Sequence, residues 1–305
     1  MNLMKNLQLK KVNYCLICKS PNLKRISLIS KNEIMNFRIK KKLFLLECKS
    51  CLHRTFSYIP SDSQLIKAYA NSDPIIVPDT NKNNLKKPNK YNFYKIAHLK
   101  KHWIFKYVDL NKKQNYFELG PGGLNLYKTF HSKGWKCCGI EPNLFTKTPG
   151  IKKNFKEINF KADVSVATDV LEHVNDPVFY LKKINSIMKK NGKIFLTFPH
   201  SQSFKSIYLK ARWSMIAPFG HVNFFSKNST NIMLQNSNFK LLLVEDFSYV
   251  ESKRLVRNIL RLPLYFIKDL FFFNFKNSFQ RIEETILNIL DLINGDQLRA
   301  VAVKL

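Results

Sequence analysis

The chain has 305 residues, of which 45% are hydrophobic and 24% are charged. This length allows one full α/β domain plus a smaller module, and the composition is ordinary for a globular protein. It excludes a membrane-spanning helix, because no run approaches about 18 uninterrupted apolar residues. The polar, basic stretch 1–14 has no apolar core, so we expect no secretory signal, a cytosolic location and cysteines that are not in disulfides.

The formal net charge is +30, from 51 lysines and arginines against 21 aspartates and glutamates. Such a charge is typical of proteins that bind nucleic acid or an anionic membrane. However, lysine pairs are scattered through both halves of the chain, and asparagine, isoleucine and phenylalanine are abundant, as in proteins of AT-rich genomes. The charge alone leaves a selected polyanion-binding surface and compositional drift open.

Four cysteines near the N-terminus form two pairs, Cys15-x-x-Cys18 and Cys48-x-x-Cys51, with 29 residues between the pairs. Two short hairpins with this spacing bring four thiolates around a tetrahedral Zn²⁺. We therefore predict a zinc-ribbon-like module with a structural zinc over residues 1–71.

A linker and a helix are expected next. Residues 72–92 carry three prolines and many asparagines and lysines, which is typical of a linker. Apolar residues then recur at helical spacing at Phe93, Ile96, Leu99, Trp103 and Tyr107, which predicts a helix over 93–109 that packs onto a sheet.

A nucleoside-cofactor pocket is indicated between residues 115 and 141. The run Asn115-Tyr-Phe-Glu-Leu-Gly-Pro-Gly-Gly-Leu124 predicts a strand and a glycine-rich turn, followed by a helix closed at Gly134 and a second strand that ends at Glu141. Glycines let the backbone approach a ligand, and a carboxylate at the end of the second strand accepts hydrogen bonds from ribose hydroxyls.

The next elements continue the alternating pattern. A short apolar strand, 164–168, leads into Asp169-Val-Leu-Glu-His-Val-Asn-Asp-Pro177, where Asp176 suits an N-cap and Pro177 the first helical position. A helix ending near Lys190 and another apolar strand, 193–198, are expected after it.

At this point the chain resembles the class I S-adenosylmethionine-dependent methyltransferases that carry Asp-Val-Leu-Glu-His-Val-x-Asp-Pro after the fourth strand. The resemblance continues through the runs 198–200 and 220–226 and covers Asn115 to Asp246. It implies an α/β fold with a Rossmann-like seven-stranded sheet over 93–305 and S-adenosylmethionine as the cofactor.

The resemblance also implies a set of cofactor-binding residues at the ends of the strands: Glu118, Gly120, Gly122, Gly123, Glu141 and Asp169. The three glycines approach the methionine end of the cofactor, and Glu118 binds its ammonium group through water. Glu141 binds the ribose, and Asp169 lies near the methyl group.

Two departures from the family pattern stand out. Leu124 occupies the position where the family often has its third glycine. The short span from Glu141 to Asp163 leaves little room for the usual helix and third strand, and Glu157 is the candidate contact for the adenine amino group.

The N-terminal part has its own resemblance, over Tyr14 to Asp73, to the zinc-ribbon start of polysaccharide-cluster and sugar methyltransferases. It rests on Cys-x-x-Cys followed by Ser20-Pro21, on the second cysteine pair, and on the aromatic strand with Pro-Ser over 56–61.

The C-terminal part departs from the expected layout. Strand 240–244 is followed by the predicted final antiparallel strand, 299–304, only after a helical insertion at about 249–296. An apolar stripe with basic neighbours in this insertion is compatible with a lid, core or dimer surface, and equally with peripheral contact of 253–275 to the inner face of a membrane.

For the base that removes a proton from the acceptor, the candidates are His200 and His221, each with a structural hydrogen bond as its alternative. His173 has a third interpretation. With Asp169 and Glu172 it matches a divalent-metal site of the resembling quinone-pathway O-methyltransferases, with packing near the cofactor as the alternative.

Three functions follow as hypotheses. The first is methyl transfer to a small-molecule acceptor, namely a sugar, nucleotide-sugar or glycolipid intermediate of surface polysaccharide synthesis. The alternatives are an RNA methyltransferase, suggested by charge and zinc ribbon, and a non-catalytic zinc-ribbon binding protein. The oligomeric state is left open.

Overall fold

The computed structural model describes residues 8–29, 42–65, 90–142, 148–218, 220–250, 255–256, 259–264 and 275–305, with side chains from residue 98 in the first long helix and from residue 279 in the last. The predicted boundary between residues 71 and 72 and nearly all of the predicted linker lie outside these ranges. The same holds for most of the predicted membrane-contact segment, 253–275.

A seven-stranded sheet forms the centre of the molecule, in the order β12-β13-β10-β9-β6-β7-β8. Five neighbouring strands run parallel, and β13 pairs antiparallel with both β10 and β12. The predicted α/β fold with a Rossmann-like seven-stranded sheet is confirmed. In chain order its strands are β6 (Asn115–Leu119), β7 (Lys136–Ile140), β8 (Ile151–Lys152), β9 (Ala162–Thr168), β10 (Met188–Pro199), β12 (Phe239–Phe247) and β13 (Gln297–Lys304).

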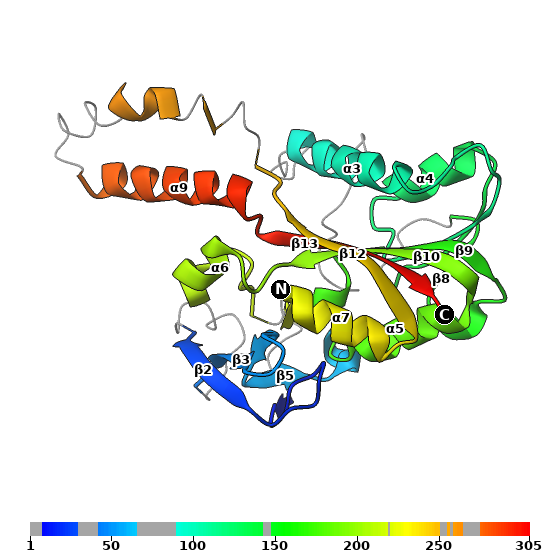
Figure 1. Cartoon of the computed structure of the whole chain (residues 1–305), viewed down its shortest axis with the longest axis horizontal. Helices are drawn as coiled ribbons and strands as arrows, with labels where there is room; N and C mark the ends of the chain where they lie inside the picture. Colours follow the sequence, from blue (N-terminus) through cyan, green and yellow to red (C-terminus); the bar gives the residue numbers. More distant parts are fainter. Residues whose placement is uncertain are drawn as a thin grey trace.

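Helices cover both faces of this sheet, α3 and α4 on one side and α5 and α7 on the other (Figure 1). Neighbouring residues of one strand serve the two layers, because successive side chains of a strand point to opposite faces. Tyr116 packs with Trp103 and Phe130 on the first face, and Phe117 packs with Leu181 on the second. The helices are α3 (Lys90–Phe105), α4 (Asn125–Ser132), α5 (Pro177–Ser186), α6 (Phe204–Leu209), α7 (Lys227–Gln235) and α9 (Phe275–Ile293).

Helix starts follow the local sequence. Asp176 caps α5 by accepting a hydrogen bond from the Phe179 backbone N–H, and Pro177 occupies its first turn. Ser226 and Ser229 form a reciprocal capping box at the start of α7. The third strand, β8, has only two residues, which agrees with the short span expected between the second and fourth strands.

The apolar stripe expected on the helix before the first strand is displaced in the structure. Trp103 and Ile104 are buried, whereas Leu99 and Tyr107 are 39% and 37% exposed. The buried side of α3 includes Lys100 instead of Leu99, and its side chain is only 12% exposed. Residues 100, 103 and 104 also follow helical spacing, so the pattern alone allowed both choices.

The N-terminal cysteine module, residues 8–65, forms a four-stranded sheet in the order β11-β4-β3-β2 and a small sheet of β1 with β5. One of these strands, β11 (Asn223–Phe224), belongs to the methyltransferase-like part of the chain and pairs antiparallel with β4. The module also packs beside α7 (Figure 1). Its own strands are β1 (Leu9–Lys11), β2 (Leu23–Leu28), β3 (Phe44–Cys48), β4 (Arg54–Phe56) and β5 (Tyr58–Pro60).

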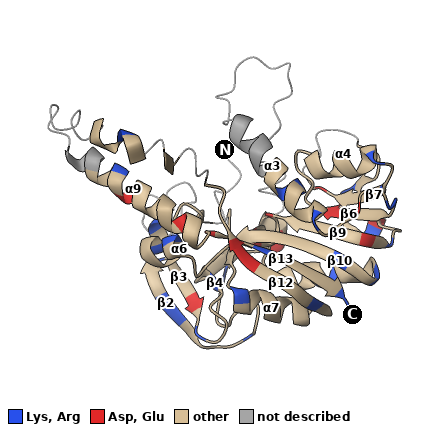
Figure 2. Cartoon of the chain, turned by 45° about the horizontal axis from the view of Figure 1, so that its top comes forward, with Lys and Arg blue, Asp and Glu red and all other residues tan. Residues whose placement is uncertain are grey.

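The insertion between β12 and β13 projects from the sheet (Figure 1). Within it the structure describes helical residues at 255–256 and 259–264, together with α9, which packs against α6. No helix in these described ranges is long and apolar enough to cross a membrane. Basic residues are spread over many elements, from β2 to α9, and do not gather on one face in the view of Figure 2.

Candidate functional site

The glycine-rich turn after β6 has the backbone shape that a ligand-binding turn needs. Gly120 and Gly122 have φ angles of 68° and 44°, in the left-handed region that favours glycine. A Cβ atom on Gly120 would lie 2.6 Å from Cγ2 of Val170, so the turn passes close to the loop after β9. Leu124 also has a positive φ, 61°, so the position where the family often has glycine keeps a left-handed conformation.

Two carboxylates border this turn. Glu141, directly after β7, is 3% exposed and accepts a hydrogen bond of 3.0 Å from the backbone N–H of Gly122. Glu118, in β6, is 4% exposed and accepts a hydrogen bond of 2.8 Å from the Tyr116 hydroxyl. Burial raises the pKa of Glu118 to about 7, so a cationic ligand near it would favour its charged form.

Asp169 follows β9 and has a partner that sequence reasoning missed. Its carboxylate accepts a hydrogen bond from the Thr197 hydroxyl at 2.7 Å and forms an ion pair with the Lys100 ammonium at 2.5 Å. Burial alone would raise the pKa of Asp169, but Lys100 and Thr197 outweigh it and hold the pKa below its ordinary value. The positive charge of Lys100 also acts on Glu118 and Glu172. The only indication of Lys100 in the sequence was that helical spacing also allowed it to lie on the buried side of α3.

Glu172, His173 and His221 come together from two segments of the chain. One ligand atom from each lies within 4.8 Å of the others, and the rings of His173 and His221 are 4.8 Å apart. The Nδ1 atom of His221 donates to the backbone carbonyl of Met215 at 2.8 Å, which leaves the lone pair of the neutral ring on Nε2. Burial lowers the pKa of both histidines, so both rings are neutral near pH 7.

Glu172 is 2% exposed, and burial, helped by the negative charge of Asp169, raises its pKa to about 8. Its Oε2 atom has no hydrogen-bond partner within the part of the chain that the structure describes. Tyr249 lies near the same two carboxylates, and burial together with their charges raises its pKa. Sequence reasoning did not indicate Tyr249, which stands just inside the insertion.

His200, the other candidate base, lies outside this cluster. It follows β10, is 3% exposed, and its Nδ1 atom lies 3.2 Å from the backbone carbonyl of Gly295. Burial lowers its pKa to about 4, and the charged groups that act on it are Asp246, Lys227 and Arg54. None of these belongs to the Asp169 region.

The four cysteines of the two pairs form one cluster. The Sγ atoms lie within 4.8 Å of one another, with 3.5 Å between Cys15 and Cys51 and between Cys18 and Cys48. A tetrahedral Zn²⁺ with Zn–S bonds of about 2.3 Å has sulfurs roughly 3.8 Å apart, so the spacing fits such an ion. The contact between Cys15 and Cys51 lowers the pKa of one thiol and raises that of the other, which fits a cluster that holds negative charge.

His53 links this cluster to the loop that carries His221. Its Nδ1 atom lies 3.9 Å from the Cys15 sulfur, and its Nε2 atom lies 3.1 Å from Oδ1 of Asn223. The Asn223 amide nitrogen donates to the carbonyls of Leu171 and Val174, on either side of Glu172 and His173. His53 belongs to no motif that the sequence made visible, and Asn223 lies in the run 220–226 but was not singled out there.

The fold and the glycine-rich turn with carboxyl groups at the ends of β6, β7 and β9 are the arrangement expected of an enzyme that uses a nucleoside cofactor. A family model described as "Methyltransferase domain" matches residues 89–244. The chain belongs to this family and is an S-adenosylmethionine-dependent methyltransferase.

A search of curated proteins found no match. Solved structures similar to this chain include a possible histamine N-methyltransferase from Thermotoga maritima, with 14% identity over 71% of this chain and 96% of that one, at a TM-score of 0.45. A putative S-adenosylmethionine-dependent methyltransferase from Listeria monocytogenes has 11% identity over 68% and 99%, at a TM-score of 0.44. An S-adenosylmethionine-dependent methyltransferase from Mesorhizobium loti has 12% identity over 70% of this chain and 98% of that one, at a TM-score of 0.44.

The residues present fit the charge of the cofactor. S-adenosylmethionine carries a sulfonium, an ammonium and a carboxylate, so its net charge is positive. The site offers the buried carboxyl groups of Glu118 and Glu172 and the partly exposed carboxylate of Asp169, and the ammonium of Lys100, paired with Asp169, lies among them as the partner for a single further carboxylate. We therefore infer that Lys100 binds the carboxylate at the methionine end.

Replacing Lys100 by methionine should weaken the binding of S-adenosylhomocysteine by roughly tenfold or more, because a charge-assisted hydrogen bond is lost. The affinity for 5′-methylthioadenosine, which lacks the amino-carboxylate end, should change less than about twofold. Titration calorimetry measures both ligands. Lys106→Met, an exposed lysine just past the end of α3, is the control. Equal losses for the two ligands, or none for either, would refute this role.

The raised pKa of Glu172 predicts a pH-dependent stability. Between its ordinary value of 4.5 and about 8, the folded protein holds a proton that the unfolded chain releases. This group therefore lowers the free energy of unfolding as pH rises through that interval. Glu172→Gln removes the titration, so the stability of the variant relative to wild type should increase from pH 5 to pH 8 in urea denaturation. Glu157→Gln, at an exposed carboxylate, should show no such trend. A Glu172→Gln difference that is the same at both pH values contradicts the assignment.

Proposed function

We propose that this methyltransferase acts on a saccharide acceptor, such as a sugar, nucleotide-sugar or glycolipid intermediate of surface polysaccharide synthesis, in the cytosol. The proposal rests on one observation. The side of the site where the acceptor would bind is built from two parts of the chain, the methyltransferase domain and the cysteine module. The loop 220–226, which bears His221, is held by the cysteine module through the β4–β11 pairing. A zinc ribbon built onto a methyltransferase in this way resembles polysaccharide-modifying enzymes and supports that substrate class.

The proposed cofactor contacts follow the geometry of the strand ends. Gly120, Gly122 and Gly123 let the backbone approach the methionine end, and Glu118 holds its ammonium group. Glu141 binds the ribose, and Asp169 lies beside the reacting methyl group. When bound, the cofactor supplies a methyl group on a sulfonium, and the protein positions the acceptor in line with it.

His221 is the proposed base. Its Nε2 lone pair would take the proton that the acceptor loses on methylation, with S-adenosylmethionine as the source of the methyl group. His221 is favoured over His200 because its ring lies 4.8 Å from that of His173 and is acted on by the charges of Glu172 and Asp169. His200 is proposed to have a structural role, through its contact with the Gly295 carbonyl.

His221→Gln should lower the single-turnover rate of methyl transfer by about 10²- to 10⁴-fold while S-adenosylhomocysteine binds with unchanged affinity. The acceptor is first found by screening sugar nucleotides and glycosyl phosphates for S-adenosylhomocysteine release. Because burial lowers the pKa of His221 below its ordinary 6.5, the wild-type rate should fall only at pH values below 6.5. His200→Gln, at a histidine that is more deeply buried than His221, is the control. Near-wild-type rates in both variants across pH 6 to 9 would exclude both histidines as the base.

We further propose that Cys15, Cys18, Cys48 and Cys51 hold one structural Zn²⁺. Support comes from the sulfur spacing and from the place of the cluster in the core. Cys15, Cys48 and Cys51 are fully buried and pack in the same apolar cluster as Phe225 and Met233. Metal binding at such a site contributes directly to folding stability.

Elemental analysis of protein purified without chelator should find about one zinc per chain, the value for a closed four-thiolate site. Cys15→Ser should lose most of the zinc and lower the melting temperature. Cys137→Ser is the matched control, because Cys137 is a partly buried thiol in β7, outside the cluster. Wild-type protein with no zinc, or equal zinc in both variants, argues against the site.

A further inference from the structure

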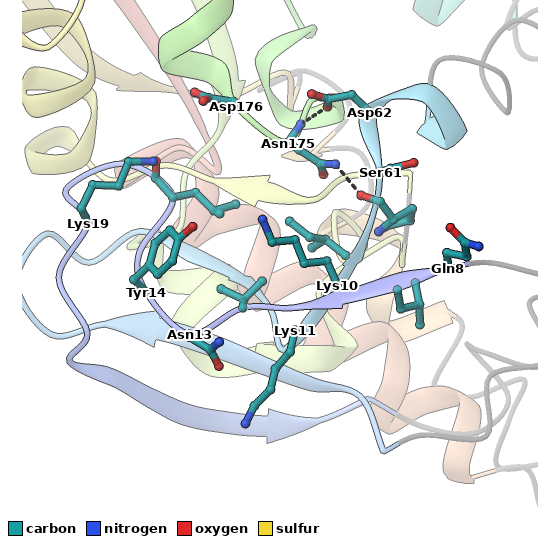
Figure 3. Close-up of a pocket in the computed structure, with 15 residues that line it drawn as sticks. Gln8, Lys10, Lys11, Asn13, Tyr14, Lys19, Ser61, Asp62, Asn175 and Asp176 are labelled. Atoms are coloured by element: carbon teal, nitrogen blue, oxygen red, sulfur yellow. Dashed lines mark hydrogen bonds between the residues drawn. The ribbon is translucent and has the colours of Figure 1, made fainter.

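A cavity of about 520 Å³ lies between the cysteine module and the start of α5. Its walls come from β1 and the turn after it, from the end of β5 and from Asn175 and Asp176, as Figure 3 shows. The residues that line the cavity include none of the proposed cofactor-binding residues and neither candidate base. The volume is within the range of cavities that bind small molecules.

Two lysines that line this cavity have ammonium groups with no ion-pair partner in the described part of the chain. Figure 3 shows the side chains of Lys10 and Lys19 on either side of Tyr14, while the side chain of Lys11, which also lines the cavity, runs in the opposite direction to that of Lys10. Lys19 donates one hydrogen bond to the backbone carbonyl of Leu16, which leaves two of its three donors for a ligand. In the described ranges of the chain, neither Lys10 nor Lys19 forms an ion pair.

The two carboxylates that border the cavity already accept hydrogen bonds from backbone N–H groups. Asp62 accepts a hydrogen bond of 2.9 Å from the Asn175 N–H, and Asp176 accepts one of 2.9 Å from the Phe179 N–H. Both lie at one rim, on the side of α5, in Figure 3. The opposite side therefore has a positive potential and suits an anion.

Beside these lysines, the exposed ring of Tyr14 offers a surface against which a ring of a ligand could pack. The Tyr14 ring is 44% exposed, and the Lys19 ammonium lies 5.7 Å from its centroid. Leu16 and Ile59 add apolar surface to the walls. An aromatic face with a few polar groups around it packs well against the apolar face of a sugar ring or against a base.

One wall of the cavity comes from the segment that directly follows His173 in the chain. Asn175 stands two residues after His173, so their Cα atoms are at most about 7.6 Å apart. The Asn175 side chain donates to the Pro60 carbonyl and thereby joins this wall to the cysteine module. This wall of the cavity therefore continues along the chain into the segment that bears His173.

We propose that this cavity binds a phosphorylated saccharide, with the phosphate between Lys10 and Lys19 and a ring on Tyr14. Binding of such a ligand does not depend on the proposed function. Its role as the methyl acceptor does, and this part of the proposal rests on the proposed function. It narrows the acceptor to glycosyl phosphates and nucleotide-linked sugars.

The test is titration calorimetry with glucose 1-phosphate and with UDP-glucose, using glucose as the uncharged comparison. The wild-type protein should bind at least one phosphorylated probe at concentrations below 10 mM, and should bind glucose more weakly. Lys10→Gln and Lys19→Gln should each weaken binding by roughly tenfold, since a charge-assisted hydrogen bond is lost. Tighter binding of UDP-glucose would identify the nucleotide-linked source, and equal binding the simple phosphate ester.

Lys24→Gln is the control, because it removes the same charge from the cysteine module at an exposed position in β2 that does not line the cavity. A loss in Lys24→Gln as large as in Lys10→Gln would mean unspecific attraction to a basic protein and would overturn the proposal. So would unchanged affinity in the Lys10→Gln, Lys19→Gln double variant, or no binding of either phosphorylated probe. S-adenosylhomocysteine affinity, measured in parallel, should stay unchanged in every variant. Phosphate-dependent binding without methylation of any bound sugar would instead refute the proposed acceptor while leaving the anion site in place.

Discussion

The antiparallel pairing of β4 with β11 is the interaction on which the rest of the site depends. It places a strand of the methyltransferase part in the sheet of the cysteine module, with Thr55 opposite Asn223 and Arg54 opposite Phe224. Side chains reinforce it, since the Thr55 hydroxyl donates to the Val222 carbonyl and Arg54 donates to Ser206. The Val222 N–H in turn donates to the Glu172 carbonyl at 2.7 Å. The module therefore forms part of the wall that positions Glu172 and His221.

The electrostatics of the site run against those of the chain as a whole. A protein with a net charge of +30 concentrates the carboxyl groups of Glu118, Asp169 and Glu172, the two glutamates buried, around the ammonium of Lys100. Burial makes each charge expensive and therefore sensitive to a bound cation. A positively charged cofactor offsets part of this cost, and the neutral sulfur of the product offsets less of it.

The sequence predicted the sheet and the strand ends well, because local rules determine them. Glycines in a turn, a carboxylate after a strand and an Asp-Pro helix start each act within a few residues, and the spacing of the four cysteines predicted the cluster that they form. The partners of these groups were not predictable. Lys100, His53 and Asn223 reach their places through packing between segments 69 to 170 residues apart. Of the two candidate bases, the sequence favoured His221 slightly, and the tertiary structure adds that His221 lies near Glu172 whereas His200 contacts Gly295.

The place of β13 in the sheet also affects how this molecule assembles. It is the last strand of the chain, yet it lies between β10 and β12, with paired residues along most of its length on both sides. During synthesis, both neighbours emerge and expose unpaired edges for the time needed to make the insertion of about 50 residues. Open strand edges invite pairing with other chains. Premature termination within the insertion would thus release a chain prone to aggregation, and not a shortened enzyme.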